Sequence, residues 1–122
     1  MVYAHRATQP RARAPRPLEK DIQNTIMEWL EYQPLFFGWR QNAGMSVREY
    51  KGNRHVFRAS SMPGISDIIG SWGGKPLAIE VKRPGEKPRP NQVEFLRRAS
   101  ESGWITIVAT SLDDVILALK SV

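Results

Sequence analysis

The sequence predicts an α/β fold in which a mixed central β-sheet is flanked by helices, with the elements in the order α-β-β-β-α-β-α. Three observations lead to this prediction. An amphipathic helical pattern comes early in the chain, two strand patterns meet at Gly73-Gly74, and a strand–helix–strand pattern follows them. The chain has 122 residues, the size of one ordinary domain.

The first 17 residues differ in composition from the rest of the chain. They contain Arg6, Arg11, Arg13 and Arg16, several prolines and no acidic residue, and their apolar residues follow no period. We therefore interpret residues 1–17 as a flexible basic tail and residues 18–122 as a single domain. Contact of the tail with phosphates and plain solvation remain equally open.

The charge balance favours an anionic partner. Lys and Arg number 18 against 12 Asp and Glu, a net charge of +6, and nucleic acid is the first candidate for such a chain. The absence of Cys excludes a disulfide framework and a thiolate metal site. No apolar run approaches the roughly 20 residues that span a bilayer, and no signal peptide is recognisable. We expect a soluble protein of the cytoplasm.

The first half of the domain is expected to hold one helix and three strands. Apolar residues at helical spacing predict a helix over 18–31, which Pro34 keeps from continuing. The aromatic segment 35–42 predicts a strand. Residues 43–63 predict two short strands around a turn at Lys51-Gly52-Asn53. This hairpin is the most basic internal segment, and we favour a grip on a phosphate backbone over a solvated surface.

The second half is expected to hold a hairpin and two helices. Residues 66–72 and 75–82 predict strands joined by the two-residue turn Gly73-Gly74. A helix is expected over 91–102, a strand over 104–110 and a last helix over 112–121. The strand is apolar and β-branched nearly throughout, which predicts a central position in the sheet. The candidate core positions of the first of these helices are Val93, Phe95, Leu96 and Ala99.

Chain direction and turn length determine how these strands should pair. A right-handed crossover from strand 75–82 through helix 91–102 makes strand 104–110 its parallel neighbour. The two-residue turn places Asp67 directly opposite Glu80, on the same face of the sheet. Lys82, two residues further along the strand, shares that face.

Two carboxylates that face each other across a strand pair repel unless a positive charge lies between them. A hard divalent cation such as Mg²⁺ or Mn²⁺ resolves the repulsion, while the lack of Cys and the presence of only two His disfavour zinc. Alternatively, Asp67 caps a turn, and Glu80 and Lys82 form an exposed ion pair that contributes little. The residues alone leave both interpretations open.

The motif Asp67, then Glu80-Val81-Lys82, resembles the D…E-x-K core of the PD-(D/E)xK nuclease superfamily. The surrounding segments "GISDII" and "LAIEVKRPGEKPRPNQVEFLRRASESGW" are similar to the virus-type replication-repair nuclease (VRR-NUC) domains. The shared features are a G-x-x-D strand, an E-V-K strand, a Pro/Gly loop and a Gln opening the next helix, here Gln92. An earlier helix with Glu19 and Gln23 also matches. The likeness covers residues 18–120, and Ser66 departs from it, because the superfamily often has Pro there.

The resemblance implies a restriction-endonuclease-like core and a Mg²⁺- or Mn²⁺-dependent endonuclease. Its substrate would be structured DNA, either branched, flapped or similar to a Holliday junction, and the protein would pair as a homodimer. A stand-alone domain of this type also suggests a phage or another mobile element. The implied metal ligands are Asp67, Glu80, the backbone carbonyl of Val81, and Glu19.

The resemblance gives the remaining site residues separate roles. Lys82 would orient the attacking water or neutralise charge on the phosphoryl oxygens. Gln23 would orient a carboxylate, and Gln92 would meet phosphate or water. For Glu19 the alternative is a favourable charge in the first turn of the helix, and for Gln92 it is simple polar exposure. The basic residues expected to contact DNA are Arg40, Arg48, Lys51, Arg54, Arg58, Arg83, Lys87 and Arg89.

Two other functions compete with the nuclease. One is a DNA-binding module on a nuclease fold without activity, although every expected acidic position and the lysine are present. The other is a protein–protein adaptor, whose binding would lack the steep salt dependence of phosphate contacts.

Overall fold

A computed structural model describes residues 17–41, 45–50, 53–58 and 62–122, with 45–50 and 53–58 described by their backbone only. The tail 1–16 and Lys51 lie outside these residues, so the predictions made for them stay predictions. The elements are α2 (Glu19–Glu31), β1 (Phe36–Arg40), β2 (Met45–Tyr50), β3 (Asn53–Arg58), β4 (Ile68–Trp72), β5 (Lys75–Val81), α3 (Pro90–Glu101), β6 (Ile105–Ala109) and α4 (Leu112–Lys120). The predicted order α-β-β-β-α-β-α is confirmed for the helices and the strands of the main sheet, and β2 and β3 form the expected hairpin after β1.

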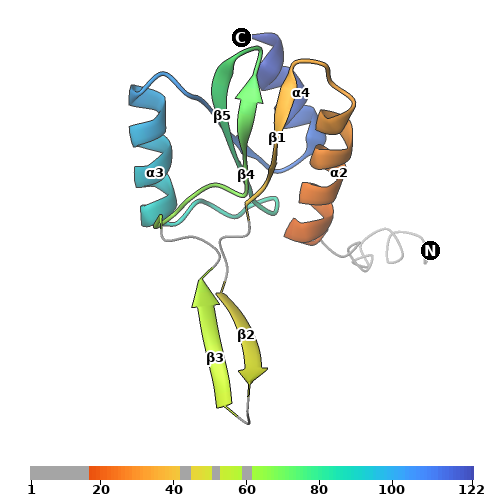
Figure 1. Ribbon diagram of the computed structural model, residues 1–122. Helices are drawn as coiled ribbons and strands as arrows, with labels where there is room; N and C mark the ends of the chain where they lie inside the picture. The colour runs from red at the N-terminus through yellow and green to blue at the C-terminus, as the bar shows by residue number, and fades with distance from the viewer. Residues whose placement is uncertain (1–16, 42–44, 51–52, 59–61) are drawn as a thin grey trace, which may run out of the picture.

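Four strands form one mixed sheet in the order β1-β4-β5-β6 (Figure 1). β1 and β5 both run antiparallel to β4, and β6 runs parallel to β5, as the predicted crossover requires. β2 and β3 pair with each other in a separate two-stranded sheet. The predicted fold class, a mixed sheet flanked by helices, is therefore confirmed.

The turn between β4 and β5 has the predicted length and register. Ile68 pairs with Ile79, and Trp72 pairs with Lys75, so partners lie at equal distances from the turn. Gly73 and Gly74 have φ angles of +57° and +84°. Two-residue hairpin turns that match the twist of the strands require positive φ at both central positions, which favours glycine there.

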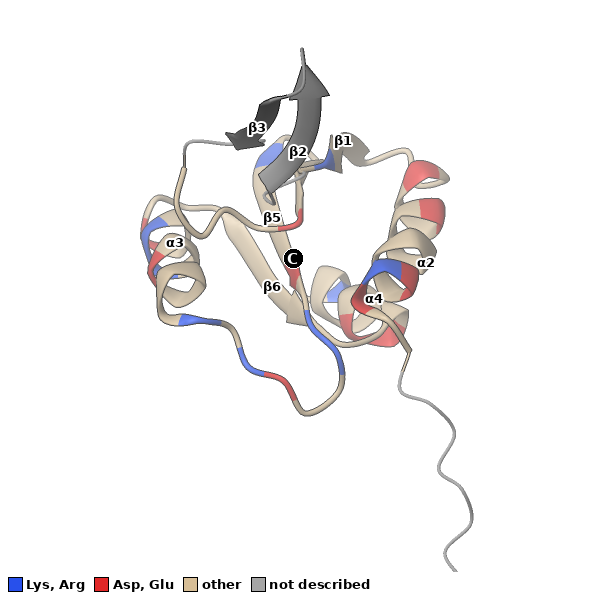
Figure 2. Cartoon of the chain, turned by 90° about the horizontal axis from the view of Figure 1, so that it is seen from below, with Lys and Arg blue, Asp and Glu red and all other residues tan. Residues whose placement is uncertain are grey.

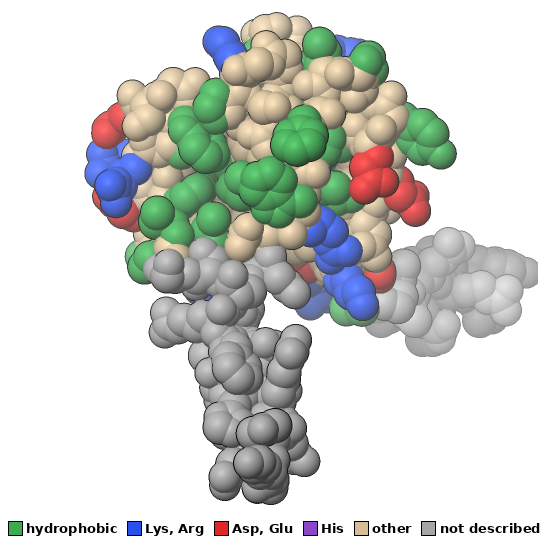
Figure 3. Space-filling view, viewed as in Figure 1, with side chains coloured by type: hydrophobic (Ala, Val, Ile, Leu, Met, Phe, Trp, Pro, Cys, Tyr) green, Lys and Arg blue, Asp and Glu red, His purple; other side chains and the backbone are tan. Residues whose placement is uncertain are grey.

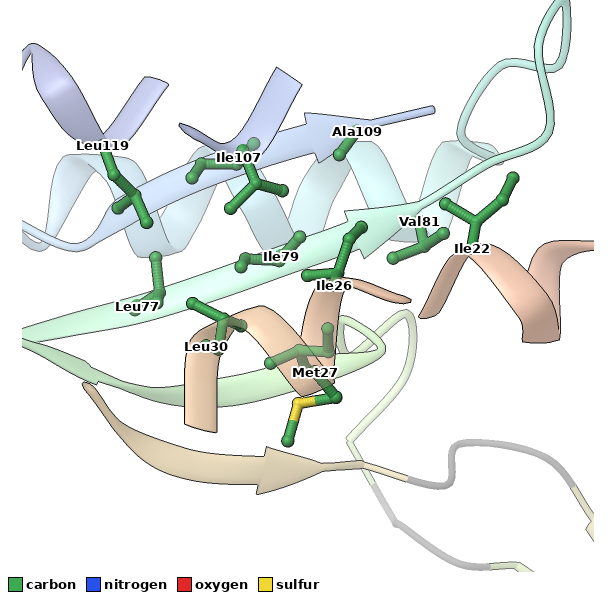
Figure 4. Packing of buried hydrophobic residues seen from close by; sticks show 12 residues of the cluster. Ile22, Ile26, Met27, Leu30, Leu77, Ile79, Val81, Ile107, Ala109 and Leu119 are labelled. Atoms are coloured by element: carbon green, nitrogen blue, oxygen red, sulfur yellow. The ribbon is translucent and has the colours of Figure 1, made fainter. Parts of the chain in front are cut away.

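The main hydrophobic core lies on one face of the sheet. α2 and α4 cover this face, and α3 covers the other (Figure 2). Ile26 and Leu30 of α2 are completely buried with Leu77 and Ile79 of β5. Figure 4 shows these side chains meeting between the helix and the strand. The core therefore fixes the position of β5, the strand that carries Glu80.

Strand β6 is at the edge of the sheet rather than in its centre, so the predicted central position is wrong. α3 and α4 both contact β6. Ile107 and Ala109 join the core on the α4 side, whereas Val108 is 44% exposed on the other face. The apolar residues of β6 are thus explained by the helices that cover the strand. They do not indicate that β6 has a neighbouring strand on both of its edges.

The predicted core position of Val93 is also wrong, because its side chain is exposed. α3 buries Gln92 and Ala99, which lie seven residues apart on one face of the helix, while Phe95 and Leu96 are half-buried. The polar Gln92 therefore points toward the sheet, where the hydrophobic pattern predicted Val93.

Candidate active site

The acidic side chains come from the strands on either side of the Gly73-Gly74 hairpin. Asp67 comes directly before β4, and continuing the β4–β5 register by one residue places it opposite Glu80. The Asp67 Oδ2 accepts a hydrogen bond of 2.8 Å from the backbone N–H of Val81. Ile79 and Val81 point into the α2 core, so Glu80 between them points to the opposite face. The structure therefore brings Asp67 and Glu80 together on one face.

The Glu80 carboxylate is buried without a hydrogen bond. The residue is 1% exposed, and neither carboxylate oxygen has a hydrogen-bond partner. Burial and, after it, the negative charge of Asp67 raise the pKa of Glu80 to about 8, against the opposing charge of Lys82. The Lys82 Nζ lies 3.7 Å from the Glu80 Oε1, and Lys82 is buried as well. The alternative of an exposed ion pair is therefore wrong.

Glu19 lies in the first turn of α2 and is half-buried. Burial raises the pKa of Glu19, and the charge of Asp67 adds to this increase while Lys82 opposes it. The side chain thus lies within the electrostatic reach of the site. Within the described ranges, however, no three or more His, Cys, Asp or Glu residues lie close enough together to hold a metal ion. Glu19 approaches the two carboxylates without completing a cage of three.

The chemistry of Asp67 and Glu80 fits a hard divalent cation. Ionised carboxylates are acceptors only, and the buried oxygens of Glu80 have no donor to satisfy them. Mg²⁺ is ordinarily held by one or two carboxylates, with waters and substrate phosphates completing its shell. Two protein carboxylates on one sheet face are therefore sufficient for such an ion.

Gln23 and Arg40 contact each other, which the sequence did not indicate. The Gln23 Oε1 accepts a hydrogen bond of 3.1 Å from the Arg40 Nη2, and the Arg40 Nη1 donates to the Asn24 side chain. Arg40 therefore ties the end of β1 to α2. The predicted roles of Gln23 beside a carboxylate and of Arg40 on DNA stay predictions.

Gln92 is buried, so its interpretation as an exposed polar residue is wrong. Its Oε1 accepts a hydrogen bond of 2.8 Å from the backbone N–H of Arg89, just before the helix. This contact satisfies a backbone donor at the start of α3. The sequence did contain a signal for this contact, because a Gln three residues after the N-cap is typical of a capping box. The signal was missed because the N-cap residue is Arg89 and not the usual Ser or Thr. Contact of Gln92 with phosphate stays a prediction.

Apart from Arg40 at the end of β1, the predicted DNA-contacting residues within the described ranges fall in two places. Arg83, Lys87 and Arg89 lie in the loop between β5 and α3, directly after Lys82, and the basic positions follow this loop in Figure 2. The Arg83 Nε donates to the Pro17 carbonyl at 3.2 Å, which holds the start of the described chain beside the loop. Arg48, Arg54 and Arg58 belong to β2 and β3, and their side chains lie outside the described part.

A cavity of about 380 Å³ lies away from the carboxylates. It is lined by α3 and by Met62, Pro63 and Trp104, and none of the predicted catalytic residues contributes to it.

Ser66, where the superfamily often has Pro, is buried with an unpaired hydroxyl. The acidic site itself is thus formed by a sheet face and a loop, an arrangement that suits a long substrate better than a small enclosed one.

The paired carboxylates lie on one face of a mixed α/β fold, which the four-stranded sheet and its flanking helices form. A solved structure described as a "VRR_NUC domain protein" matches it with a TM-score of 0.57 and 21% sequence identity. The match covers 87% of this chain and 88% of that chain. No family model and no curated protein matches the sequence. The resemblance noted in the motifs is confirmed as a structural match, and at this identity the match establishes the fold.

No helix among the described residues is both long enough and apolar enough to cross a membrane.

Proposed function

We propose that this protein is a divalent-metal-dependent endonuclease that hydrolyses phosphodiester bonds in structured DNA, such as branched, flapped or junction-like substrates. The observation that carries the proposal is the buried Glu80 carboxylate, which has no hydrogen-bond partner and lies opposite Asp67 beside a buried Lys82. Burial of a carboxylate without hydrogen bonds costs free energy, and a bound cation would offset that cost. Such strongly perturbed groups are typical of functional sites. The nuclease-like fold supports the same conclusion.

Asp67, Glu80 and the carbonyl of Val81 would hold the cation, and Glu19 would reach it directly or through water. A bound Mg²⁺ or Mn²⁺ polarises the scissile phosphate and acidifies a water. The hydrogen bond from the Val81 N–H orients Asp67 and leaves its second oxygen for ligation. Lys82 is held beside Glu80, where its ammonium can orient the water and neutralise charge on the phosphoryl oxygens.

Positive charge next to this site supports a nucleic-acid substrate. Arg83, Lys87 and Arg89 follow Lys82 in the chain, and the whole molecule has a net charge of +6. Contacts between Lys or Arg and phosphates supply affinity that is independent of base sequence. The loop 83–89 would therefore position the DNA backbone across the carboxylates.

Cleavage of a branched DNA oligonucleotide tests the proposal. Wild-type protein should nick it in Mg²⁺ and leave it intact in EDTA, and Lys82→Ala should lose at least about a hundredfold in rate, as loss of one transition-state donor does. Lys75→Ala is the matched control, because Lys75 is the exposed first residue of β5, whereas Lys82 directly follows the last residue of that strand. Metal-independent cleavage, or full activity of Lys82→Ala, contradicts the proposal. Binding of the oligonucleotide without any cleavage indicates an inactive DNA-binding module.

A further inference from the structure

Two large aromatic side chains are exposed on strand β1. Phe37 is 73% exposed and Trp39 is 48% exposed, although both belong to a strand of the main sheet. Alternate residues of a strand point to the same face, so the two rings are neighbours. Their centroids lie 6.3 Å apart in an edge-to-face arrangement. The pair forms an exposed aromatic surface, which we call the β1 aromatic pair.

The β1 aromatic pair lies on the face of the sheet that carries the carboxylates. Trp39 pairs with Ile69, which is two residues after Asp67 and therefore on the same face as Asp67. The helix on this face, α3, contacts β5 and β6, and within the described chain it does not contact β1 or β4. Figure 3 shows hydrophobic side chains gathered on the surface between α3 and α2.

Hydrogen bonds connect the β1 aromatic pair to the acidic site. The Trp39 indole N–H donates to the Gln41 Oε1 at 3.1 Å, and the Gln41 backbone N–H donates to the Asp67 carbonyl at 2.6 Å. Strand spacing and rise place the Cα atom of Trp39 about 8 Å from that of Asp67, and that of Phe37 about 14 Å away. A polymer whose phosphate lies at the carboxylates would thus extend its neighbouring units over these rings.

We propose that Phe37 and Trp39 stack against unpaired bases of the substrate strand next to the scissile phosphate. This inference rests on the proposed nuclease function and narrows its substrate to DNA with single-stranded or frayed bases beside the cut. Aromatic side chains bind every base through its flat face, so the surface adds affinity without sequence preference. A fully stacked duplex offers no free base to these rings.

A second copy of the chain is a less suitable occupant. Two aromatic side chains supply at most about 500 Å² of contact area. A stable interface between proteins needs about 800 Å² from each partner. The position beside Asp67, on the face that would receive the phosphate, favours a nucleic-acid strand instead.

Binding of fluorescein-labelled DNA in EDTA tests the inference separately from catalysis. The probes are a single-stranded oligonucleotide and the same sequence in a blunt duplex, measured by fluorescence anisotropy. Phe37→Ala and Trp39→Leu should each weaken single-strand binding by about tenfold and leave duplex binding unchanged. Tyr32→Ala is the control, because Tyr32 is an exposed aromatic residue at the end of α2.

A further variant separates stacking from the hydrogen bond to Gln41. Trp39→Phe keeps a ring and loses the indole N–H, so it should retain most of the single-strand affinity. Equal losses on both probes, no loss on either, or a change from dimer to monomer in sedimentation of Phe37→Ala overturns the inference. If wild-type protein cleaves no DNA in Mg²⁺, the proposed function is contradicted. The binding measurements in EDTA still test base stacking, because they do not depend on cleavage.

Discussion

At Glu80, burial and the charge of Asp67 both act against the ionised carboxylate and raise its pKa to about 8. In the unfolded chain this carboxyl should have its ordinary pKa of 4.5. The folded, metal-free protein therefore binds the proton more strongly than the unfolded chain does. This contribution to stability is complete below the unfolded pKa and is lost as the pH rises through the folded one.

The free energy of unfolding of the metal-free protein should accordingly fall between about pH 5 and pH 8. Glu80→Gln should flatten this decline, because the amide cannot ionise. Urea denaturation in EDTA across this pH range measures both. A slope that survives unchanged in Glu80→Gln would assign the effect to another group. Mg²⁺ should stabilise wild-type protein more at pH 8 than at pH 6, since it competes with the proton.

At the scale of elements, β1 and β4 approach each other closely at two glycines. A Cβ on Gly70 would lie 2.3 Å from the Phe37 carbonyl oxygen and 2.7 Å from the Gly38 Cα. Both of these atoms belong to the backbone of the neighbouring strand, which has little freedom to move. This close approach sets the position of β1, and with it Trp39 and Gln41 beside Asp67.

Gly70→Ala should therefore destabilise the protein by at least about 2 kcal/mol, because the added methyl group forces the two strands apart. Gly74→Ala is the comparison: nothing lies within 4 Å of its Cβ, and the only strain comes from its φ of +84°. It should cost about 1 kcal/mol. Chemical denaturation of both variants measures the difference. Equal losses would show that the strand approach is not the constraint.

The pairing of β4 with β5 follows from local features, while the extent of burial does not. The Gly73-Gly74 turn and the alternation of the strands predict the register that places Asp67 opposite Glu80. The burial of Gln92 and the exposure of Val93 depend on which face α3 turns to the sheet. Packing against β5 and β6 determines which face of α3 turns to the sheet. The hydrophobic pattern of α3 alone did not predict this orientation.

For the whole molecule, the excess of positive charge should make DNA binding strongly dependent on salt. Each phosphate contact contributes about −0.9 to the slope of log K against log salt concentration for duplex DNA. Lys87→Ala should reduce the magnitude of this slope by about one, since Lys87 is exposed in the loop after Lys82. Anisotropy titrations over a salt series measure it.

Lys120→Ala is the control for this experiment, because Lys120 lies in the last turn of α4 and changes the net charge equally. An equal change of slope in both variants would mean that net charge acts in place of a local contact. Binding of wild-type protein that does not weaken with salt would support a protein–protein adaptor instead.

The sequence by itself determined the order of helices and strands, the parallel pairing of β5 with β6 and the opposition of Asp67 and Glu80. These features depend on period, turn length and chain direction, which act over a few residues or one crossover. Only the tertiary structure decided that β6 is an edge strand, that Glu80 is buried without a hydrogen-bond partner and that the β1 aromatic pair shares the carboxylate face. Burial and electrostatic environment arise from segments far apart in the chain, so local patterns do not specify them.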